Sequence, residues 1–181
     1  YSCTNKLFNK LSMGVAPTTT PTGGNPGPIG GTFTPADKDE LQTAVDAWDA
    51  DSTSAEAQYG DISTWDVTNV QDFRELFKDK TNITSLDLSN WNVQLVHPSP
   101  DNTFLRMFKG CTSLTDLNVS NLLTDRDGFY TAFRAGPSIG EIFMDCTSLV
   151  NIVGLDTWQT YRILSMANMF TNCESLQTID L

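Results

Sequence analysis

Apolar and polar residues alternate with two different spacings from about residue 60 to the end of the sequence. After Trp65, four apolar residues fall at positions i, i+3, i+6 and i+7, a spacing that places them on one face of a short helix: Val70, Phe73, Leu76 and Phe77. Ile83, Leu86 and Leu88 follow, and the polar residue between the last two is typical of a short strand whose alternate residues face inward. The pattern therefore predicts a unit of one short helix and one short strand.

The same unit recurs further along the chain. A pair of residues ending in Phe occurs four times, and an aliphatic residue follows nine positions after each Phe. The pairs are Leu76-Phe77, Met107-Phe108, Ile142-Phe143 and Met169-Phe170, and the aliphatic residues are Leu86, Leu117, Ile152 and Ile179. One such unit cannot cover its own apolar face, whereas stacked units share a core and align their strands in a parallel sheet. The repeats predict an α/β solenoid of about four coils over residues 60–181, with the four Phe rings in one interior file.

These repeats resemble the BspA-type leucine-rich repeats of surface proteins, whose units have roughly 26 residues. The resemblance covers about residues 59–181. It rests on four phrases: Ile-Ser-Thr-Trp-Asp-Val-Thr-Asn-Val (62–70), Leu-Asp-Leu-Ser-Asn-Trp-Asn-Val (86–93), Met-Phe-Lys-Gly-Cys-Thr-Ser-Leu (107–114) and Met-Phe-Thr-Asn-Cys-Glu-Ser-Leu (169–176). The resemblance implies adhesion or protein–protein recognition. Leu122 stands where the family has Trp, and two insertions, 95–101 and 123–137, are predicted to form loops.

Three segments precede the repeats. Residues 1–13 are a short N-terminal segment with Leu7, Phe8, Leu11 and Met13 at a loosely helical spacing. Residues 14–34 form a linker rich in Pro, Thr and Gly, which hold neither a helix nor an inner strand. Residues 35–59 are predicted to be a helical cap, with Thr34 as the N-cap, Pro35 as the first helical residue and a helix running to about Asp49. Four apolar residues give this helix one face with which to close the repeat core: Leu41, Ala44, Val45 and Trp48. Residues 55–59 are expected to be a short connection.

Net charge argues against nucleic acid as a partner. The formal net charge is −11, all 22 acidic residues follow Thr34, and no cluster of Lys and Arg interrupts them.

No apolar run is long enough for a transmembrane helix. The chain begins at Tyr1 without Met, which suggests a processed precursor or a fragment. Asn82-Ile83-Thr84 and Asn118-Val119-Ser120 are glycosylation sequons. The sequons and the Pro, Thr and Gly content of residues 14–34 predict an extracellular or cell-surface location, or the surface of a virion.

Three cysteines occupy one position of the repeat, three residues after each Phe, and Lys80 takes that position in the first coil. Cys111, Cys146 and Cys173 could be buried free thiols or could form disulfides between coils. Cys3 could bridge to the domain or to another chain. A zinc site is not expected, because no CxxC pair occurs and His97 is the single histidine.

Two further repeat positions could bind a ligand. Trp65, Trp91 and Trp158 share one position and are either core residues or a column for sugar stacking. The phrase Asp61–Trp65 aligns with Asp87–Trp91 and with Asn118–Leu122. This alignment predicts an outward row of Asp61, Asp87, Asn118 and Asp180, with Gly154 at that position in the fourth coil. Such a row could hold calcium or a glycan, or it could simply be solvated.

Catalysis has little support in the sequence, because a nucleophile needs a neighbouring base and His97 is the only imidazole. We therefore predict no catalytic residues, no metal and no cofactor. The sequence favours a non-enzymatic surface protein that binds a protein or a cell-surface glycan. The predicted contact residues lie in the two insertions and the outward row: Val96, His97, Arg126, Phe129, Tyr130, Asp61, Asp87 and Asn118. A filament, sheath or capsid subunit that assembles through residues 1–13 and an open end at Leu181 is the alternative.

Overall fold

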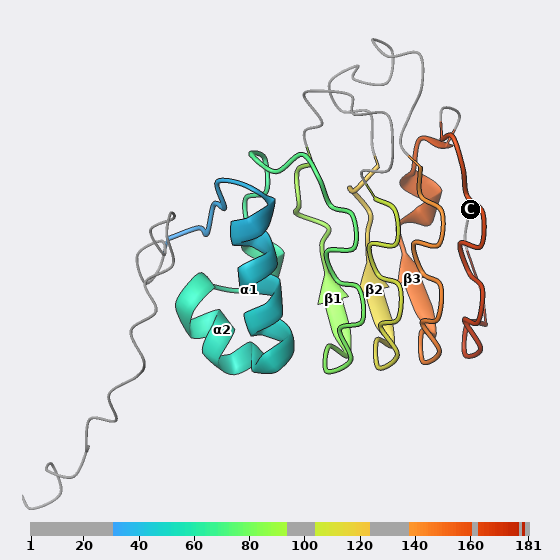
Figure 1. The fold of residues 1–181 in the computed structure, drawn as a ribbon, viewed down its shortest axis with the longest axis horizontal. Helices are drawn as coiled ribbons and strands as arrows, with labels where there is room; N and C mark the ends of the chain where they lie inside the picture. The colour runs from blue at the N-terminus through green and yellow to red at the C-terminus, as the bar shows by residue number, and fades with distance from the viewer. Residues whose placement is uncertain (1–30, 94–103, 124–137, 161–162, 178, 180–181) are drawn as a thin grey trace, which may run out of the picture.

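The computed structural model describes residues 31–93, 104–123, 138–160, 163–177 and 179. Two α-helices come first, α1 (Lys38–Ala50) and α2 (Ser52–Tyr59), and the short 3-10 helix η1 (Ile62–Thr64) follows. The remaining elements are β1 (Ser85–Asp87), β2 (Asp116–Asn118), β3 (Asn151–Val153) and the 3-10 helix η2 (Leu155–Thr157). The fold is a small α/β arrangement whose strands form one parallel sheet in the order β1-β2-β3 (Figure 1). Residues 1–30, which hold the predicted N-terminal segment and most of the linker, lie outside the described part.

Each strand contributes one buried residue at its centre. Leu86, Leu117 and Ile152 pair across the sheet and are only 3%, 2% and 5% exposed. The strand residues on either side of them point outward, because successive side chains of a strand face opposite sides. The predicted alignment of the aliphatic residues is thus confirmed for three turns. Ile179, the fourth, is 37% exposed and lies outside the sheet.

The half of each unit that was predicted to be a short helix is instead a series of tight turns. Leu76, Lys78 and Lys80 each donate a backbone N–H to the carbonyl three residues earlier. Glu75 and Asp79 have φ values of 57° and 59°, in the left-handed region that a right-handed helix cannot accommodate. The helix prediction was wrong because residues three and four apart also face the same way in turns of this kind.

Successive turns are joined by the backbone groups that a helix would have used internally. The alternate N–H groups of Glu75, Phe77 and Asp79 donate to the carbonyls of the next turn, at 3.1, 2.8 and 2.8 Å. The acceptors are Leu105, Met107 and Lys109. Each turn therefore satisfies half of its N–H groups locally and half against its neighbour, which couples the turns to one another.

Four phenylalanine rings form a single file through the interior, as the sequence predicts. Phe77 and Phe108 have ring centroids 5.3 Å apart, and Phe143 lies 5.6 Å from Phe108 and 5.6 Å from Phe170. All three pairs are stacked. The first three rings are fully buried, whereas Phe170 is half-buried and, among the described residues, stacks against Phe143 alone.

The first helix begins later than predicted. Asp37, not Thr34, is the N-cap of α1, and its carboxylate accepts a 3.0 Å hydrogen bond from the Glu40 N–H. The Glu40 side chain in turn accepts from the Ala36 N–H at 2.8 Å. This reciprocal arrangement satisfies more backbone donors than a Thr34 cap would, which explains the shift.

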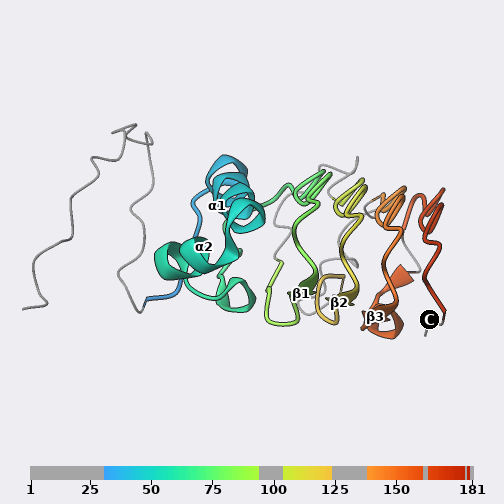
Figure 2. The same ribbon diagram turned by 90° about the horizontal axis from the view of Figure 1, so that it is seen from below.

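Residues expected to form a connection are part of a second helix. Asp51 caps α2 by accepting from the N–H groups of Thr53 and Ser54, and Gly60 ends the helix at a φ of 75°. Both α-helices lie at one end of the row of turns (Figure 2). The buried stripe of α1 predicted from the sequence is present, since Leu41, Ala44 and Val45 are fully buried.

Candidate interaction surface

The three strands present six outward side chains in two rows. Hydrogen-bonded register places Asp87, Asn118 and Val153 side by side, and it places Ser85, Asp116 and Asn151 in the row beside them. Five of the six are exposed and Asn118 is half-buried. We call these six residues the strand face. Because the turns beneath are hydrogen-bonded to one another, the strand face is presented on a fixed frame.

The predicted outward row is only partly correct. Asp87 and Asn118 are neighbours, but Val153 occupies the position assigned to Gly154, and Asp61 caps η1 instead of lying on a strand. Gly154 has a φ of 94°, and a Cβ atom there would come within 2.2 Å of the Ser120 Cα. Glycine is therefore needed where the chain leaves β3, and the alignment shifts by one residue.

The polar residues of the predicted row share a local role. Asp61, Asp87 and Asn118 each accept a hydrogen bond from the backbone N–H two residues later, at 2.8, 3.0 and 3.2 Å. Asn118 also accepts from the Ser120 hydroxyl at 2.6 Å. Asp87 and Asn118 therefore shape the turns that follow β1 and β2, and Asp61 caps η1 with the same kind of hydrogen bond. Glycosylation stays a prediction; Asn82 is exposed, whereas the Asn118 side chain is half-buried and bonded.

A hollow adjoins the strand face, and sequence reasoning did not identify it. It has a volume of about 490 Å³ and lies between the end of α1, the start of α2 and β1. Its lining consists of Trp48, Asp49, Ala50, Asp51, Ser52 and residues 82–85. Asp49 accepts a 2.9 Å hydrogen bond from the Asn82 N–H, which ties α1 to the first turn, and the Ser54 hydroxyl lowers the pKa of Asp51. The hollow depends on how α1 packs against the first turn, and no local sequence pattern predicts that packing.

Basic side chains are gathered away from the strand face. The Lys and Arg residues of the described part all form ion pairs with acids of the tight turns or of α1: Lys38, Arg74, Lys78, Lys80, Arg106 and Lys109. Hydrogen bonds from Arg106 and Lys109, at 3.0 and 2.7 Å, lower the pKa of Glu141 to about 2. Within the described residues, none of these cations pairs with Asp49, Asp51, Asp87 or Asp116. The strand face and the hollow therefore keep their negative charge.

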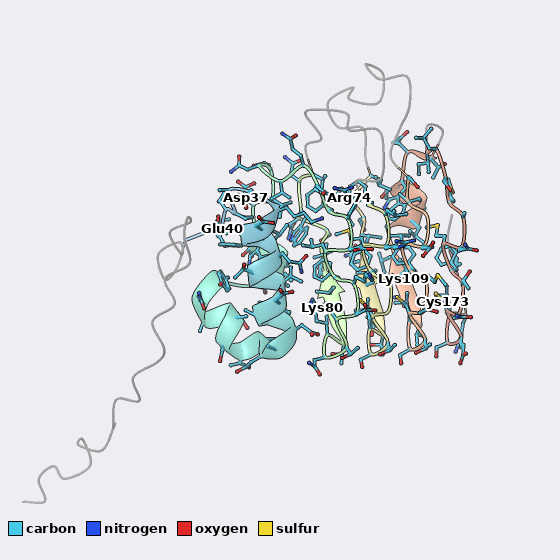
Figure 3. All side chains as sticks on the ribbon, viewed as in Figure 1. Asp37, Glu40, Arg74, Lys80, Lys109 and Cys173 are labelled. Atoms are coloured by element: carbon cyan, nitrogen blue, oxygen red, sulfur yellow. The ribbon has the colours of Figure 1, made fainter. Side chains whose placement is uncertain are left out.

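The three repeat cysteines are free thiols, which is one of the two predicted alternatives. Each Sγ donates to the carbonyl of the Phe in the preceding turn at 3.0 Å. Burial raises the pKa of the half-buried Cys173 to about 11, and the Cys146 thiol together with burial raises that of Cys111. Lys80, which takes this position in the first turn, instead pairs with Asp46 of α1 at 2.8 Å (Figure 3). Cys3 lies outside the described residues.

The tryptophans belong to the core. Trp65, Trp91 and Trp158 are 1%, 0% and 6% exposed, and each indole N–H donates to a backbone carbonyl at 2.8 to 3.1 Å. Their faces stack on other rings, as Trp65 does on Trp91 with centroids 6.2 Å apart. A sugar cannot stack on rings that do not reach the surface, so the sugar-stacking alternative is wrong.

Asp180 of the predicted outward row lies outside the described residues, as do several predicted contacts: Val96, His97, Arg126, Phe129 and Tyr130. Within the described ranges, no group of three or more His, Cys, Asp or Glu side chains is placed to hold a metal ion. No helix among those ranges is long and apolar enough to cross a membrane. What the described surface offers chemically is an array of carboxylates and amides suited to hydrogen bonding and ion pairing.

Comparison with known proteins gives one match. A family model described as "Mycoplasma protein of unknown function, DUF285" matches residues 52–135 and 137–180, which is more than half of the chain. The matched residues include α2 and all three strands. No curated protein and no solved structure matches the chain.

Proposed function

The chain belongs to the family described as Mycoplasma protein of unknown function, DUF285, and on that premise we propose that it is a non-enzymatic surface protein that recognises another protein. We propose further that its turns are BspA-type leucine-rich repeats that form a short solenoid. The register of β1, β2 and β3 and the file of four Phe rings support this interpretation, since both repeat once per unit. We place the protein outside the cell or at its surface, in keeping with the exposed Asn82 sequon.

The strand face and the hollow together form the proposed recognition surface. Ser85 joins them, because it lines the hollow and pairs with Asp116 on the next strand. A surface that is already held in place loses little conformational freedom when a partner binds. A surface made of loops that must first become ordered loses more, and binding to it is weaker for that reason. Exposed residues on a rigid scaffold are the usual basis of recognition by repeat proteins.

Unneutralised charge is the observation that carries the proposal. Asp49, Asp51, Asp87 and Asp116 lie on or beside the strand face without a basic partner among the described residues. A partner that brings Lys or Arg would complement these carboxylates and would associate faster at low ionic strength. Val153 is 46% exposed and Val150 is 41% exposed beside β3, so the partner also needs an apolar side chain at that end. The preferred partner is therefore a basic protein segment with an apolar flank.

A displayed library of random peptides tests this proposal. Panning against the whole protein should enrich peptides rich in Lys and Arg, and their binding should weaken as salt is added. The double substitution Asp87→Asn and Asp116→Asn should weaken binding about five- to tenfold, since two exposed ion pairs are worth about 1 kcal/mol together.

The matched control changes the net charge equally on the helices, away from the strand face. Asp39→Asn with Glu56→Gln removes two exposed carboxylates that form no ion pair among the described residues. This control should bind the enriched peptides as the wild type does. Enrichment of peptides without basic residues, or an equal loss in the control, would contradict the proposal.

A structural subunit of a filament, sheath or capsid is the second candidate. Leu164 and Met166 of the last described turn are 55% and 43% exposed, which favours contact with another chain at that end. Electron microscopy of the purified protein separates the two functions. Ordered polymers would favour the structural role, and dispersed particles would favour recognition.

A further inference from the structure

The strand β1 has a free edge that faces the hollow. In the order β1-β2-β3, β1 pairs on one side only among the described residues. Leu88, which directly follows β1, donates its N–H to the carbonyl of Asn118 in β2 at 2.9 Å. Because the main-chain groups of alternate strand residues point to opposite edges, the N–H and C=O of Ser85 point away from β2. Ser85 also lines the hollow, so these groups face into it.

The later turns show what such groups bond to when a strand precedes them. Thr115 donates both its N–H and its hydroxyl to the Thr84 carbonyl, at 2.8 and 2.9 Å. Val150 and Asn151 donate their N–H groups to the Thr115 carbonyl at 2.9 and 3.2 Å. One carbonyl of the preceding turn thus accepts two hydrogen bonds at the start of each of these strands. By the register of the sheet, Thr84 and Ser85 are the equivalent residues of the first turn.

The donors of Thr84 and Ser85 have no such carbonyl. On the free side of β1 lie α1 and α2 instead of a strand (Figures 1 and 2). The repeat that aligns Asp61 with Asp87 places the equivalent residues at the end of α2, where the chain is helical. Among the described residues, nothing accepts from the N–H groups of Thr84 and Ser85 or from the Thr84 hydroxyl. The hollow therefore occupies the place of the missing acceptor.

The other wall of the hollow is negatively charged. It consists of the end of α1 and the start of α2, and it contributes the side chains of Asp49 and Asp51. The last turn of α1 holds no basic residue, so the partial negative charge of the helix end adds to that of the carboxylates. Trp48 is half-buried in the same lining and offers a ring on which the aliphatic part of a long side chain can pack. A strand placed here meets main-chain donors on one side and negative charge on the other.

We propose that the hollow binds an extended segment of another protein, which adds to the sheet along the free edge of β1 and carries Lys or Arg. The inference rests on the proposed function, because it specifies how the basic partner segment binds. A carbonyl of the segment accepts from Thr84 and Ser85, as the Thr84 carbonyl does from the next turn. Main-chain bonds supply affinity for any extended chain, and the two carboxylates select a basic one. The volume of about 490 Å³ is that of an ordinary ligand site, which spans about 300 to 1,000 Å³.

A capped peptide of alternating residues, Lys-Val-Lys-Val-Lys-Val, is the probe, because β-branched residues favour the extended conformation. Amide hydrogen exchange on the whole chain is measured by NMR with and without saturating peptide. Exchange at the N–H groups of Thr84 and Ser85 should slow at least about tenfold when the peptide binds. Exchange at Thr115 and Val150 should change little, since their N–H groups are already bonded.

Two N-methylated forms of the peptide form a matched pair of controls. Methyl groups on two central residues that are two positions apart block one edge of an extended strand and leave the other edge free. Methyl groups on two adjacent central residues block both edges. The two forms have the same composition, yet the adjacent form should bind at least about tenfold more weakly than the alternate form. Equal binding of the two forms would overturn strand addition.

A substitution in the protein tests the hydroxyl donor. Thr84→Val removes the hydroxyl equivalent to that of Thr115, and in protein made without N-linked glycans it should weaken peptide binding about three- to tenfold. Thr81→Val is the matched control, because Thr81 is exposed in the same turn but lies outside the lining of the hollow. An equal effect of the two substitutions would count against the inference.

The failure of strand addition is distinguishable from the failure of the proposed function. Salt-dependent binding that leaves the N–H groups of Thr84 and Ser85 unprotected would overturn the inference and keep recognition of basic segments. Protection by the peptide that does not weaken with salt would keep strand addition and contradict recognition by charge. Protection of both groups in the free chain would overturn the inference, because the chain itself would then fill the hollow.

Discussion

Removing one ring from the middle of the phenylalanine file tests how the core is held together. Phe108 is fully buried, and it stacks on Phe77 at 5.3 Å and on Phe143 at 5.6 Å. Phe108→Ala leaves a cavity where a ring was and breaks two stacked pairs. Truncation of a buried Phe costs about 3 to 5 kcal/mol, and each ring pair accounts for about 0.5 to 1.5 kcal/mol beyond its buried area. We expect a loss of about 4 to 5 kcal/mol, close to the whole stability of a marginal domain.

Phe170→Ala is the matched control for this experiment. The same side chain is removed from the same file, but Phe170 is half-buried and stacks on one ring among the described residues, so we expect a loss of about 2 kcal/mol. Urea unfolding followed by tryptophan fluorescence measures both variants, because Trp91 and Trp158 lie 6.0 and 6.2 Å from rings of the file. A loss below about 1.5 kcal/mol for Phe108→Ala, or equal losses for the two variants, would refute the packing described for the core.

Three further predictions concern pH, thiols and a glycine. Arg106 and Lys109 hold the pKa of Glu141 near 2, below its unfolded value of about 4.3. The Glu141 carboxylate therefore stabilises the fold above pH 4, and this contribution is lost as the pH falls towards 2. The thermal midpoint of Glu141→Gln should depend less on pH in that window than the thermal midpoint of the wild type does. In a Cys3→Ser background, Cys111 and Cys146 of the folded protein should resist alkylation, because both are buried. Cys173, which is half-buried and has a pKa of about 11, should react first, and faster as the pH rises. Mass spectrometry identifies the modified residue, and early modification of Cys111 would contradict its burial. Gly154→Ala should cost more than about 2 kcal/mol, because φ is 94° and the new Cβ would meet Ser120, whereas Gly60→Ala, whose nearest neighbour is 3.9 Å away, should cost about 1 kcal/mol; calorimetry of both variants tests this difference.

Repetition made the sheet and the core predictable from the sequence. Leu86, Leu117 and Ile152 stand at one position of the repeat, and a shared position in stacked units means a shared register, which the strand pairs confirm. The Phe file follows from the same reasoning. The cysteine position was also informative, although the choice between thiol and disulfide needed the contacts of each Sγ with a carbonyl.

Local conformation was less predictable. Tight turns replace the expected helices, and they contain residues in the left-handed region, among them Glu75 and Asp79. Neither Glu nor Asp predicts a positive φ as strongly as glycine does. The N-cap moved from Thr34 to Asp37 because Glu40 completes its hydrogen bonds. The short helix α2 was missed even though Asp51 and Gly60 mark its ends.

The candidate surface was only partly accessible to sequence reasoning. Asp87 and Asn118 were placed correctly as neighbours, because their positions follow the register. The hollow beside them depends on the packing of α1 against the first turn, and the absence of basic partners depends on where Lys38 and Lys80 reach. Contacts between elements that are distant in the chain produce no regular residue spacing, so the sequence alone does not predict them.

Hydrogen bonding from the tight-turn N–H groups of each unit to the carbonyls of the next is the claim on which the fold depends, and amide hydrogen exchange on the chain alone measures it most directly. We predict slow exchange at the interior donors Phe77, Phe108 and Phe143, and fast exchange at the equivalent Phe170. Equal protection at Phe170 and Phe143, or fast exchange at Phe77 and Phe108, would contradict it.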